Sequence, residues 1–366
     1  MVNALKLIVK IILILIVCYP AISFRADAAP SPSASADQAI LIEAESGRVL
    51  FEKNAHTEQK IASITKIMTA HLAMKHGNPE ELVKISPEAS VTEGSSLYLK
   101  AGQKVSLLDL VYGLLLRSGN DSAVAIAEHI SGSVEEFSKL MNKEAKKIGM
   151  KHSHFTNPHG LDLDNEHYSS SFDMALLTQE ALKNELFAKI FGTESHKATS
   201  IDPSPVWNNK HRLITGMYPH ATGGKTGYTK QAGRTLVTTA KRDGMTLIVV
   251  TIRASNDWND HMNLFEYGFA NYKKTAILHP DTLPPFPGQN SNEFYTLVDP
   301  FEYPLTEEEK PLVSIEGNIP YNRKSPPVVT VKLGQEIIHE QELIKETRST
   351  VFSRWERFIE KVIFWQ

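Results

Sequence analysis

The segment Ala62-Ser63-Ile64-Thr65-Lys66-Ile67-Met68-Thr69 decides how the rest of this chain is interpreted. It opens a stretch, Ser63 to Lys75, in which apolar residues recur at the threes and fours of an amphipathic helix. On such a helix Ser63 and Lys66 are neighbours, so the lysine amine can reach the serine hydroxyl. An unassisted serine is a poor nucleophile near neutral pH, and a neutral lysine can serve as its base. The spacing alone is weak evidence, because such a pair usually marks a cap or a solvated face.

Two further short motifs give the first one its meaning. They are Ser118-Gly119-Asn120 and Lys225-Thr226-Gly227. If Lys66 is the base, its pKa must be lowered, and both burial and a second cation at Lys225 lower it, because both disfavour the ammonium form. Ser118 offers a hydroxyl that can pass a proton to a leaving amine. Asn120 can accept from and donate to a substrate backbone amide.

The third motif predicts a receptor for a free carboxylate. Lys225 offers a positive charge and Thr226 a hydroxyl, which together suit charge-assisted hydrogen bonds to a carboxylate. Gly227 has no side chain, so a substrate backbone can approach the strand edge closely. The three motifs together predict acyl transfer to a serine, with no metal and no cofactor.

With their flanking residues, these motifs resemble a known family. Serine-x-x-lysine, serine-x-asparagine and lysine-threonine-glycine, in this order, are the signature of penicillin-binding proteins and serine β-lactamases. The chain most resembles the low-molecular-mass D-alanyl-D-alanine carboxypeptidases of peptidase family S11, and among them the sporulation-associated form of endospore-forming bacteria. The resemblance covers about Asp37 to Tyr272. It is carried by the first segment and by Arg117-Ser118-Gly119-Asn120-Asp121, Asn157-Pro158-His159-Gly160-Leu161 and Gly223-Gly224-Lys225-Thr226-Gly227-Tyr228-Thr229.

The resemblance assigns a role to each motif. It makes Ser63 the acylated nucleophile, Lys66 its base, and Ser118 and Asn120 the proton relay and substrate clamp. It implies a β-lactamase/transpeptidase-like fold, peptidoglycan stem pentapeptides ending in D-Ala-D-Ala as substrates, and β-lactam antibiotics as covalent inhibitors. Removal of the terminal D-Ala would limit cross-linking, in cell-wall or spore-cortex maturation.

The same resemblance makes Lys225 and Thr226 the receptor for the substrate carboxylate and adds an oxyanion hole. The hole would consist of the backbone N–H groups of Ser63 and Tyr228, which stabilise the charge that develops in acyl transfer. There is one departure from the pattern. Some relatives carry an arginine after the third motif that helps to hold the carboxylate, whereas here the stretch reads Ser255-Asn256-Asp257-Trp258. Arg253 is near but out of register, so it is not placed in the site.

The N-terminal 29 residues have the features of an export signal. Lys6 and Lys10 precede the apolar run Ile11 to Cys18, and Ala26-Asp27-Ala28 offers small residues for cleavage. The run ends before the roughly 20 residues that a membrane-spanning helix needs. Because the single cysteine lies in this segment, the mature protein is expected to have no disulfide.

The remaining chain is expected to have an α+β fold with several parts. Residues 30–36 predict a flexible linker, and 37–282 predict the catalytic domain. Short strand-like runs at both ends of that domain flank turns, at Ala39 to Ile42, Arg48 to Phe51, Arg234 to Ala240 and Thr246 to Ile252. Helical patterns fill the middle, at Ser63 to Lys75, Val105 to Ile130 and Val134 to Ile148. We therefore expect a sheet of terminal strands covered by helices.

A shift to proline-rich sequence near Leu283 predicts a second, β-rich domain over 283–346. Beyond it, 347–366 is an amphipathic helical pattern with Trp355, Phe358, Phe364 and Trp365 among basic residues. That composition is typical of a helix lying in the membrane interface. The alternative is a helix that packs on its own domain. We expect the protein at the outer face of the cytoplasmic membrane, held by this tail.

Composition and spacing argue against several other functions. The formal net charge of -3 offers no basic stripe for phosphates, so nucleic acid is not an expected partner. The histidines at 152, 154, 159 and 167 match no helix-based zinc motif. Pro219 stands where a phosphate loop before Lys225 would need its first glycine. The surroundings of Glu166 lack the class A β-lactamase pattern. A penicillin-binding sensor that is acylated without turnover, and a β-lactamase, remain the alternative functions.

Overall fold

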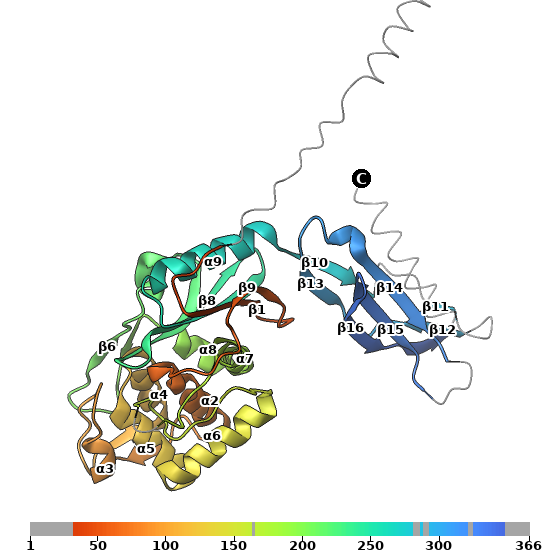
Figure 1. The fold of residues 1–366 in the computed structure, drawn as a ribbon. Coiled ribbons are helices and arrows are strands. Elements are labelled where there is room, and N and C mark those ends of the chain that lie inside the picture. The colour runs from red at the N-terminus through yellow and green to blue at the C-terminus, as the bar shows by residue number, and fades with distance from the viewer. Residues whose placement is uncertain (1–31, 163–164, 281–285, 288–292, 321–324, 348–366) are drawn as a thin grey trace, which may run out of the picture. The chain divides into compact units, whose positions relative to one another are not determined.

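The computed structural model describes residues 32–162, 165–280, 286–287, 293–320 and 325–347 (Figure 1). The predicted export signal, 1–29, lies outside the described residues. So does the predicted tail apart from its first residue, Thr347, which ends a strand. The domain boundary at 282/283 falls among residues that are not described and stays a prediction.

A five-stranded antiparallel sheet in the order β2-β1-β9-β8-β7 forms the centre of the catalytic part. Its strands are β1 (Gln38–Glu43), β2 (Val49–Lys53), β7 (Ala221–Thr229), β8 (Gly233–Arg242) and β9 (Met245–Ile252). The two pairs of strand-like runs predicted around turns are both antiparallel hairpins, β1–β2 and β8–β9. At the second, Asp243 and Gly244 have φ angles of 51° and 78°, and two positive φ angles in succession match the twist of the flanking strands.

The sheet is buried on both faces, because successive side chains of its strands pack into two different cores. Ile40 and Ile42 of β1 contact the helical cluster, whereas Leu41 contacts a second cluster with Leu264 and Phe265 of α9 (Asp257–Asn271). Successive side chains of a strand point to opposite faces, so one apolar strand can serve both. Figure 1 shows α9 on one side of the sheet, and α2 and α4 to α8 on the opposite side.

The helical part is built from elements between β2 and β7. They are η1 (Ala62–Thr65), α2 (Lys66–His76), α3 (Pro87–Ser90), α4 (Leu107–Leu116), α5 (Asn120–Ser131), α6 (Val134–Ile148), α7 (Ser171–Leu182), α8 (Glu185–Phe191) and η2 (Leu213–Met217), with the short strands β3 (Leu82–Lys84), β4 (Lys104–Ser106), β5 (Ser195–Lys197) and β6 (Val206–Asn208). Serine side chains cap several N-termini, as Ser106 caps α4 and Ser133 caps α6.

The helical pattern from Val105 to Ile130 is two helices rather than one. It breaks at Arg117 to Gly119, between α4 and α5, where Ser118 has a φ of 66°. The apolar spacing continues across the break because both helices pack on the same core. The break matters because it carries the second motif.

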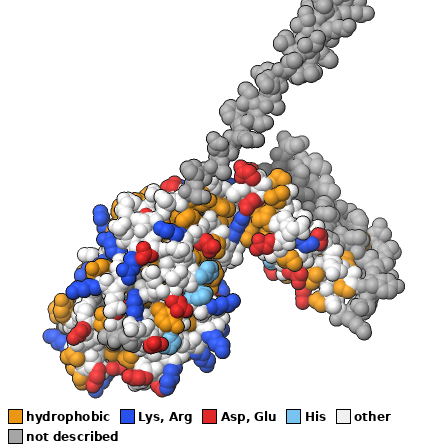
Figure 2. All heavy atoms as spheres, viewed as in Figure 1, with side chains coloured by type: hydrophobic (Ala, Val, Ile, Leu, Met, Phe, Trp, Pro, Cys, Tyr) orange, Lys and Arg blue, Asp and Glu red, His pale blue; other side chains and the backbone are white. Residues whose placement is uncertain are grey.

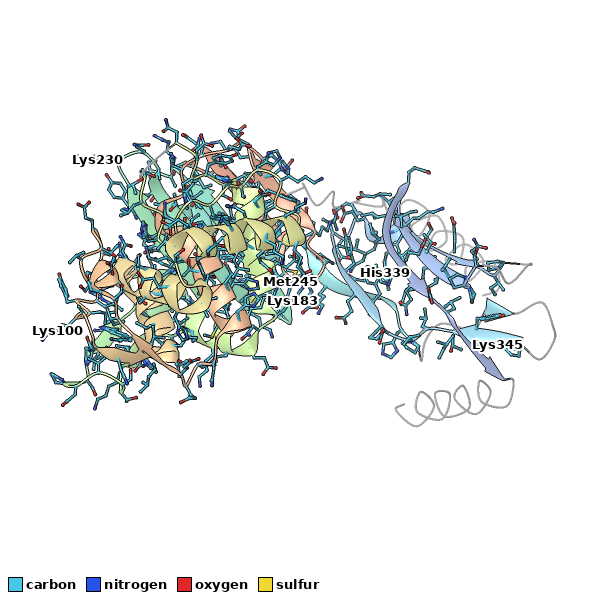
Figure 3. All side chains as sticks on the ribbon, turned by 90° about the horizontal axis from the view of Figure 1, so that it is seen from below. Lys100, Lys183, Lys230, Met245, His339 and Lys345 are labelled. Carbon is cyan, nitrogen blue, oxygen red and sulfur yellow. The ribbon has the colours of Figure 1, made fainter. Side chains whose placement is uncertain are left out.

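The C-terminal strands form small antiparallel sheets around their own cluster of Leu278, Leu297, Val329, Val331 and Leu343. They are β10 (Lys273–Leu278), β11 (Phe286–Pro287), β12 (Glu293–Thr296), β13 (Phe301–Leu305), β14 (Val313–Asn318), β15 (Val328–Leu333), β16 (Glu336–Glu342) and β17 (Ile344–Thr347), with the turn η3 (Lys310–Leu312). This agrees with the predicted β-rich segment, except that β10 and Leu278 lie before its predicted start at 283. Figure 3 shows His339 and Lys345 on these strands.

The surface mixes charges. On the face seen in Figure 2, the acidic and basic side chains of the described residues are interspersed. None of the helices in the described ranges is both long and apolar enough to cross a membrane.

Candidate active site

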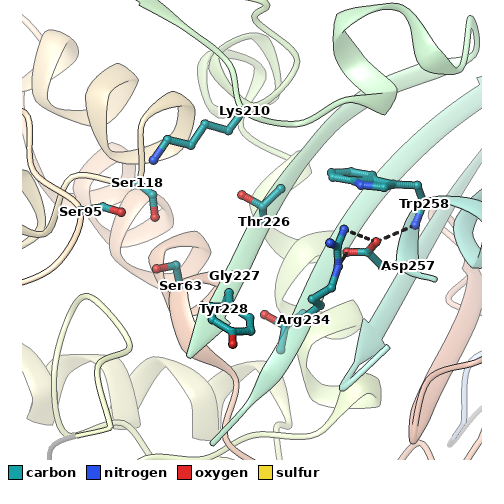
Figure 4. Close-up of a pocket in the computed structure, with 11 residues that line it drawn as sticks. Ser63, Ser95, Ser118, Lys210, Thr226, Gly227, Tyr228, Arg234, Asp257 and Trp258 are labelled. Atoms are coloured by element: carbon teal, nitrogen blue, oxygen red, sulfur yellow. Dashed lines mark hydrogen bonds and ion pairs between the residues drawn. The ribbon is translucent and has the colours of Figure 1, made fainter. Parts of the chain in front are cut away.

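All three motifs meet at one open pocket of about 490 Å³ (Figure 4). The predicted residues in its lining are Ser63, Ser118, Thr226, Gly227 and Tyr228. Lys66, Asn120 and Lys225 lie directly beneath, each less than 5% exposed. Ser63 and Tyr228 are 165 positions apart in sequence, so only the fold brings these residues together.

Lys66 lies within hydrogen-bonding distance of Ser63 and of two carbonyl-type oxygens. Its Nζ lies 3.0 Å from Ser63 Oγ, 2.7 Å from Asn120 Oδ1 and 2.7 Å from the carbonyl oxygen of His159. A neutral amine has two N–H groups and one lone pair. The two carbonyl-type oxygens can only accept, so they occupy the two N–H groups and leave the lone pair for the Ser63 hydroxyl. This arrangement suits proton abstraction from Ser63.

Burial and charge favour the neutral form of Lys66. Its pKa lies well below the usual lysine value because the side chain is fully buried, and Lys225 and Lys210 lower the pKa further. Burial and Lys210 also lower the pKa of Lys225 to about 7. The sequence predicted that Lys225 lowers the pKa of Lys66. It does so here, although burial lowers that pKa more.

The second motif lies in the turn between α4 and α5. Ser118 is held at φ 66°, a strained value for a residue with a side chain, and its Oγ accepts a hydrogen bond from Lys225 Nζ at 3.1 Å. Asn120, at the start of α5, accepts from Lys66 and donates to the Glu93 carbonyl at 2.5 Å. Both ends of its amide are thus engaged within the protein. In this structure Asn120 positions Lys66, and its role as substrate clamp stays a prediction.

The third motif lies on β7, which is one of the two edge strands of the sheet. A side chain on Gly227 would lie 2.9 Å from the Ser63 backbone nitrogen and 2.4 Å from Thr235 Oγ1, so only glycine lets the strand pass this close to Ser63. Lys225 Nζ bonds Ser118 Oγ and the Thr226 carbonyl at 2.6 Å. The Thr226 side chain faces the pocket, whereas the Lys225 ammonium lies behind it.

The loop at 157–161 packs against the turn that carries Ser63. Gly160 has a φ of 86°, and a side chain there would lie 1.9 Å from the Ala62 carbonyl oxygen. Asn157 Oδ1 accepts from the Gly160 N–H at 2.7 Å, and the Pro158 carbonyl accepts from Thr69 Oγ1 at 2.6 Å. The loop therefore fixes both the turn before Ser63 and the helix after it.

Two of the clustered histidines have structural roles. The His167 ring accepts from the Thr156 N–H at Nδ1, so its Nε2–H donates to Thr65 Oγ1 at 2.8 Å. His159 supplies its carbonyl oxygen to Lys66, and burial lowers the pKa of its ring to about 3. Over the described ranges, no group of three or more His, Cys, Asp or Glu side chains is arranged to hold a metal ion.

The pocket also contains residues that no motif indicated. They are Ser95, Lys210, Arg234, Thr235, Asp257 and Trp258. Ser95 is brought in by a loop that Asp121 anchors, through hydrogen bonds from the Leu97 and Leu99 N–H groups. The aspartate beside the second motif was the available signal for that loop. No local pattern marks Lys210 or Arg234. Arg253, which was left out of the site, does not line the pocket.

Comparisons with known proteins agree with this site. The chain is 38% identical over 247 residues to D-alanyl-D-alanine carboxypeptidase DacF of Bacillus subtilis, covering 65% of this chain and 63% of that one. It is 34% identical over 265 residues to D-alanyl-D-alanine carboxypeptidase DacC of Escherichia coli, covering 69% and 65%. The matches thus span a little under two thirds of the length of these relatives.

The fold also matches a solved relative. Penicillin-binding protein 5 from Haemophilus influenzae superposes with a TM-score of 0.73 at 28% identity, covering 86% of this chain and 97% of that one. This confirms the α+β fold with its C-terminal β-rich part. The family model for Peptidase_S11, D-alanyl-D-alanine carboxypeptidase, matches residues 25–256. This chain therefore belongs to the S11 family of serine peptidases, the D-alanyl-D-alanine carboxypeptidases.

Proposed function

We propose that this protein is a serine D-alanyl-D-alanine carboxypeptidase, which removes the terminal D-Ala from peptidoglycan stem pentapeptides. The observation that carries the proposal is the buried Lys66 amine, 3.0 Å from Ser63 Oγ, with its two N–H groups taken by carbonyl-type oxygens. With both N–H groups engaged, a neutral amine has its lone pair free to accept a proton from the Ser63 hydroxyl. Membership of the S11 family supports the same activity.

The reaction proceeds through an ester on Ser63. Lys66 takes the hydroxyl proton as Ser63 Oγ attacks the carbonyl carbon of the penultimate D-Ala. The oxyanion is stabilised by the backbone N–H groups of Ser63 and Tyr228. Ser118, which contacts Lys225, relays a proton to the leaving amine, and free D-alanine departs. Water then attacks the ester and gives one proton to Lys66, which passes it to the departing Ser63 oxygen, so the shortened peptide is released and the Ser63 hydroxyl and neutral Lys66 are restored.

Release of D-alanine from a pentapeptide ending in D-Ala-D-Ala tests the proposal directly. The wild-type protein should release one D-alanine from each peptide and turn over many peptides. Ser63→Ala should release none. A β-lactam should add its mass to one peptide, the one that contains Ser63, and that adduct should persist when His152 or His154 is replaced. Adduct formation without any D-alanine release would favour the sensor function, whereas rapid β-lactam hydrolysis would favour a β-lactamase.

We further propose that the enzyme acts outside the cytoplasmic membrane, attached by its tail. The pattern of residues 1–29 supports export, and the aromatic and basic residues of 347–366 support an interfacial helix. β-Lactams are the expected covalent inhibitors. A role in the spore cortex stays a prediction.

A further inference from the structure

An arginine that belongs to none of the motifs lines the active-site pocket. Arg234 lies on β8, opposite Tyr228 of β7. Its Nε donates to Asp257 Oδ2 at 3.0 Å and its Nη2 to Asp257 Oδ1 at 2.6 Å. The guanidinium also lies 5.9 Å from the centre of the Trp258 ring. Two residues at the start of α9 thus hold this side chain in one orientation.

The ion pair is unequal in its burial, which leaves the arginine accessible. The Asp257 side chain is 5% exposed and that of Arg234 is 46% exposed. The pair uses two of the five N–H donors of a guanidinium, so three remain for another acceptor. A planar donor fork of this kind matches a carboxylate. Asp257 therefore fixes the orientation of Arg234 and leaves its remaining N–H donors available in the pocket.

The other charged groups near the motifs are less suited to meet a carboxylate directly. Lys225 is 1% exposed, and its amine is engaged with Ser118 and the Thr226 carbonyl. Among the pocket-lining residues in the described ranges, the cations are Lys210 and Arg234. Figure 4 shows Lys210 directed toward Ser118, and Arg234 on the other side of Thr226 from Ser63 and Ser118. The residue that leaves from Ser63 carries the terminal carboxylate, so its receptor must line the same pocket as Ser63, as Thr226 and Arg234 do.

We propose that Arg234, held by Asp257, receives the terminal carboxylate of the substrate together with the Thr226 hydroxyl. Arg234 is then a specificity residue, which selects peptides that end one residue after the scissile bond. Lys225 contributes positive potential from behind without touching the carboxylate. This inference rests on the proposed carboxypeptidase function and identifies the side chain that binds the C-terminal carboxylate of the substrate.

The alternative is a structural ion pair, in which Arg234 contributes only to folding stability. The two roles differ in substrate dependence. We would compare a pentapeptide ending in D-Ala-D-Ala with the same peptide carrying a C-terminal amide. In the wild type, kcat/KM should be at least roughly tenfold higher for the free acid. Arg234→Gln should lower kcat/KM for the acid far more than for the amide, so that the acid-to-amide ratio approaches one.

Two variants complete the design. Arg234→Lys keeps the positive charge but loses the planar pair of donors, so it should keep part of the preference for the free acid. If Arg234→Gln does not fold, this variant tests the inference. Arg242→Gln is the matched control, because Arg242 lies at the other end of β8 and pairs with Glu266 instead. It should retain the wild-type ratio. An unchanged ratio in Arg234→Gln, or an equal loss on both peptides, would overturn the inference.

A second readout separates this inference from the proposed function. The rate at which penicillin acylates Ser63 can be compared with the rate for its methyl ester, and neither measurement requires turnover of a peptide. Arg234→Gln should lower the acid-to-ester ratio of acylation rates. If the wild type cleaves no peptide but shows this change, the proposed function fails and Arg234 remains the carboxylate receptor. If the wild type cleaves peptide and neither ratio changes in the variant, only the Arg234 inference fails.

Discussion

Lys66, Lys210 and Lys225 place three amines around one pocket, and the charge of Lys210 affects the protonation of the other two. Lys66 and Lys225 are buried, whereas Lys210 is exposed at the pocket. The charge of Lys210 lowers the pKa of both buried lysines. Because a general base must be neutral to accept a proton, the exposed lysine influences how much of the enzyme is active at a given pH.

Replacing Lys210 with glutamine should therefore move the pH profile. Loss of its positive charge raises the pKa of Lys66, so a smaller fraction of Lys66 is neutral at any given pH. The acid limb of kcat/KM should shift to higher pH, with a loss of roughly 3- to 10-fold at neutral pH. That is well short of the about 10²- to 10⁴-fold loss expected when a general base is removed. The measurement is the pH dependence of D-alanine release.

Lys100→Gln is the control for Lys210→Gln. Lys100 is also exposed, and Figure 3 shows it at the periphery of the catalytic part. This substitution makes the same change in net charge and should leave the profile in place. A uniform loss of activity across pH in Lys210→Gln would show that Lys210 acts by substrate contact instead.

At the scale of elements, the site depends on a close contact between the loop 157–161 and the 3-10 turn η1. Ala62, the first residue of that turn, has a φ of 50°, and Gly160 packs against its carbonyl oxygen. Strained backbone of this kind persists only where its surroundings enforce it. The loop, α2 and β7 together provide those surroundings for Ser63.

Gly160→Ala tests this contact. The new methyl group would lie 1.9 Å from the Ala62 carbonyl oxygen at a φ of 86°, so the loop and the turn must separate. The free energy of unfolding should fall by about 2–4 kcal/mol, and D-alanine release should fall at least tenfold because Ser63 moves relative to Lys66. Urea unfolding and the D-alanine assay measure the two effects.

Gly149→Ala controls for backbone strain alone. Gly149 ends α6 with a φ of 93°, and a side chain there would meet no atom within 4 Å. It should cost only about 1–2 kcal/mol of stability and leave the activity unchanged. Equal effects of the two substitutions would mean that the contact with Ala62 does not hold the nucleophile.

At the scale of the whole molecule, the catalytic motifs all lie between Ser63 and Tyr228, far in sequence from the predicted anchor at 347–366. Deleting the tail should therefore release a soluble enzyme with the wild-type kcat/KM. Fractionation of cells that express the truncated and full-length forms measures the distribution. If the truncated form stays with the membrane after removal of residues 1–29, the tail is not the anchor.

Much of this protein was predictable from local sequence. The strand pairs β1–β2 and β8–β9 follow from alternating apolar residues around glycine turns, since both signals arise within a few residues. The pairing of Ser63 with Lys66 follows from their spacing, because residues three apart on a helical turn share a face. The order of the three motifs indicated the family, and the comparisons confirm it.

Other features were decided only by tertiary structure. The break at Ser118 is hidden in the sequence because α4 and α5 both bury apolar faces on one core. Arg234 and Asp257 are 23 residues apart and meet only because α9 packs on β8 and β9. Lys210 lies in a segment without regular structure, and its charge lowers the pKa of Lys66 and Lys225. Periodicity and spacing report which face a residue occupies on its own element, whereas these contacts depend on how separate elements pack, which local sequence does not encode.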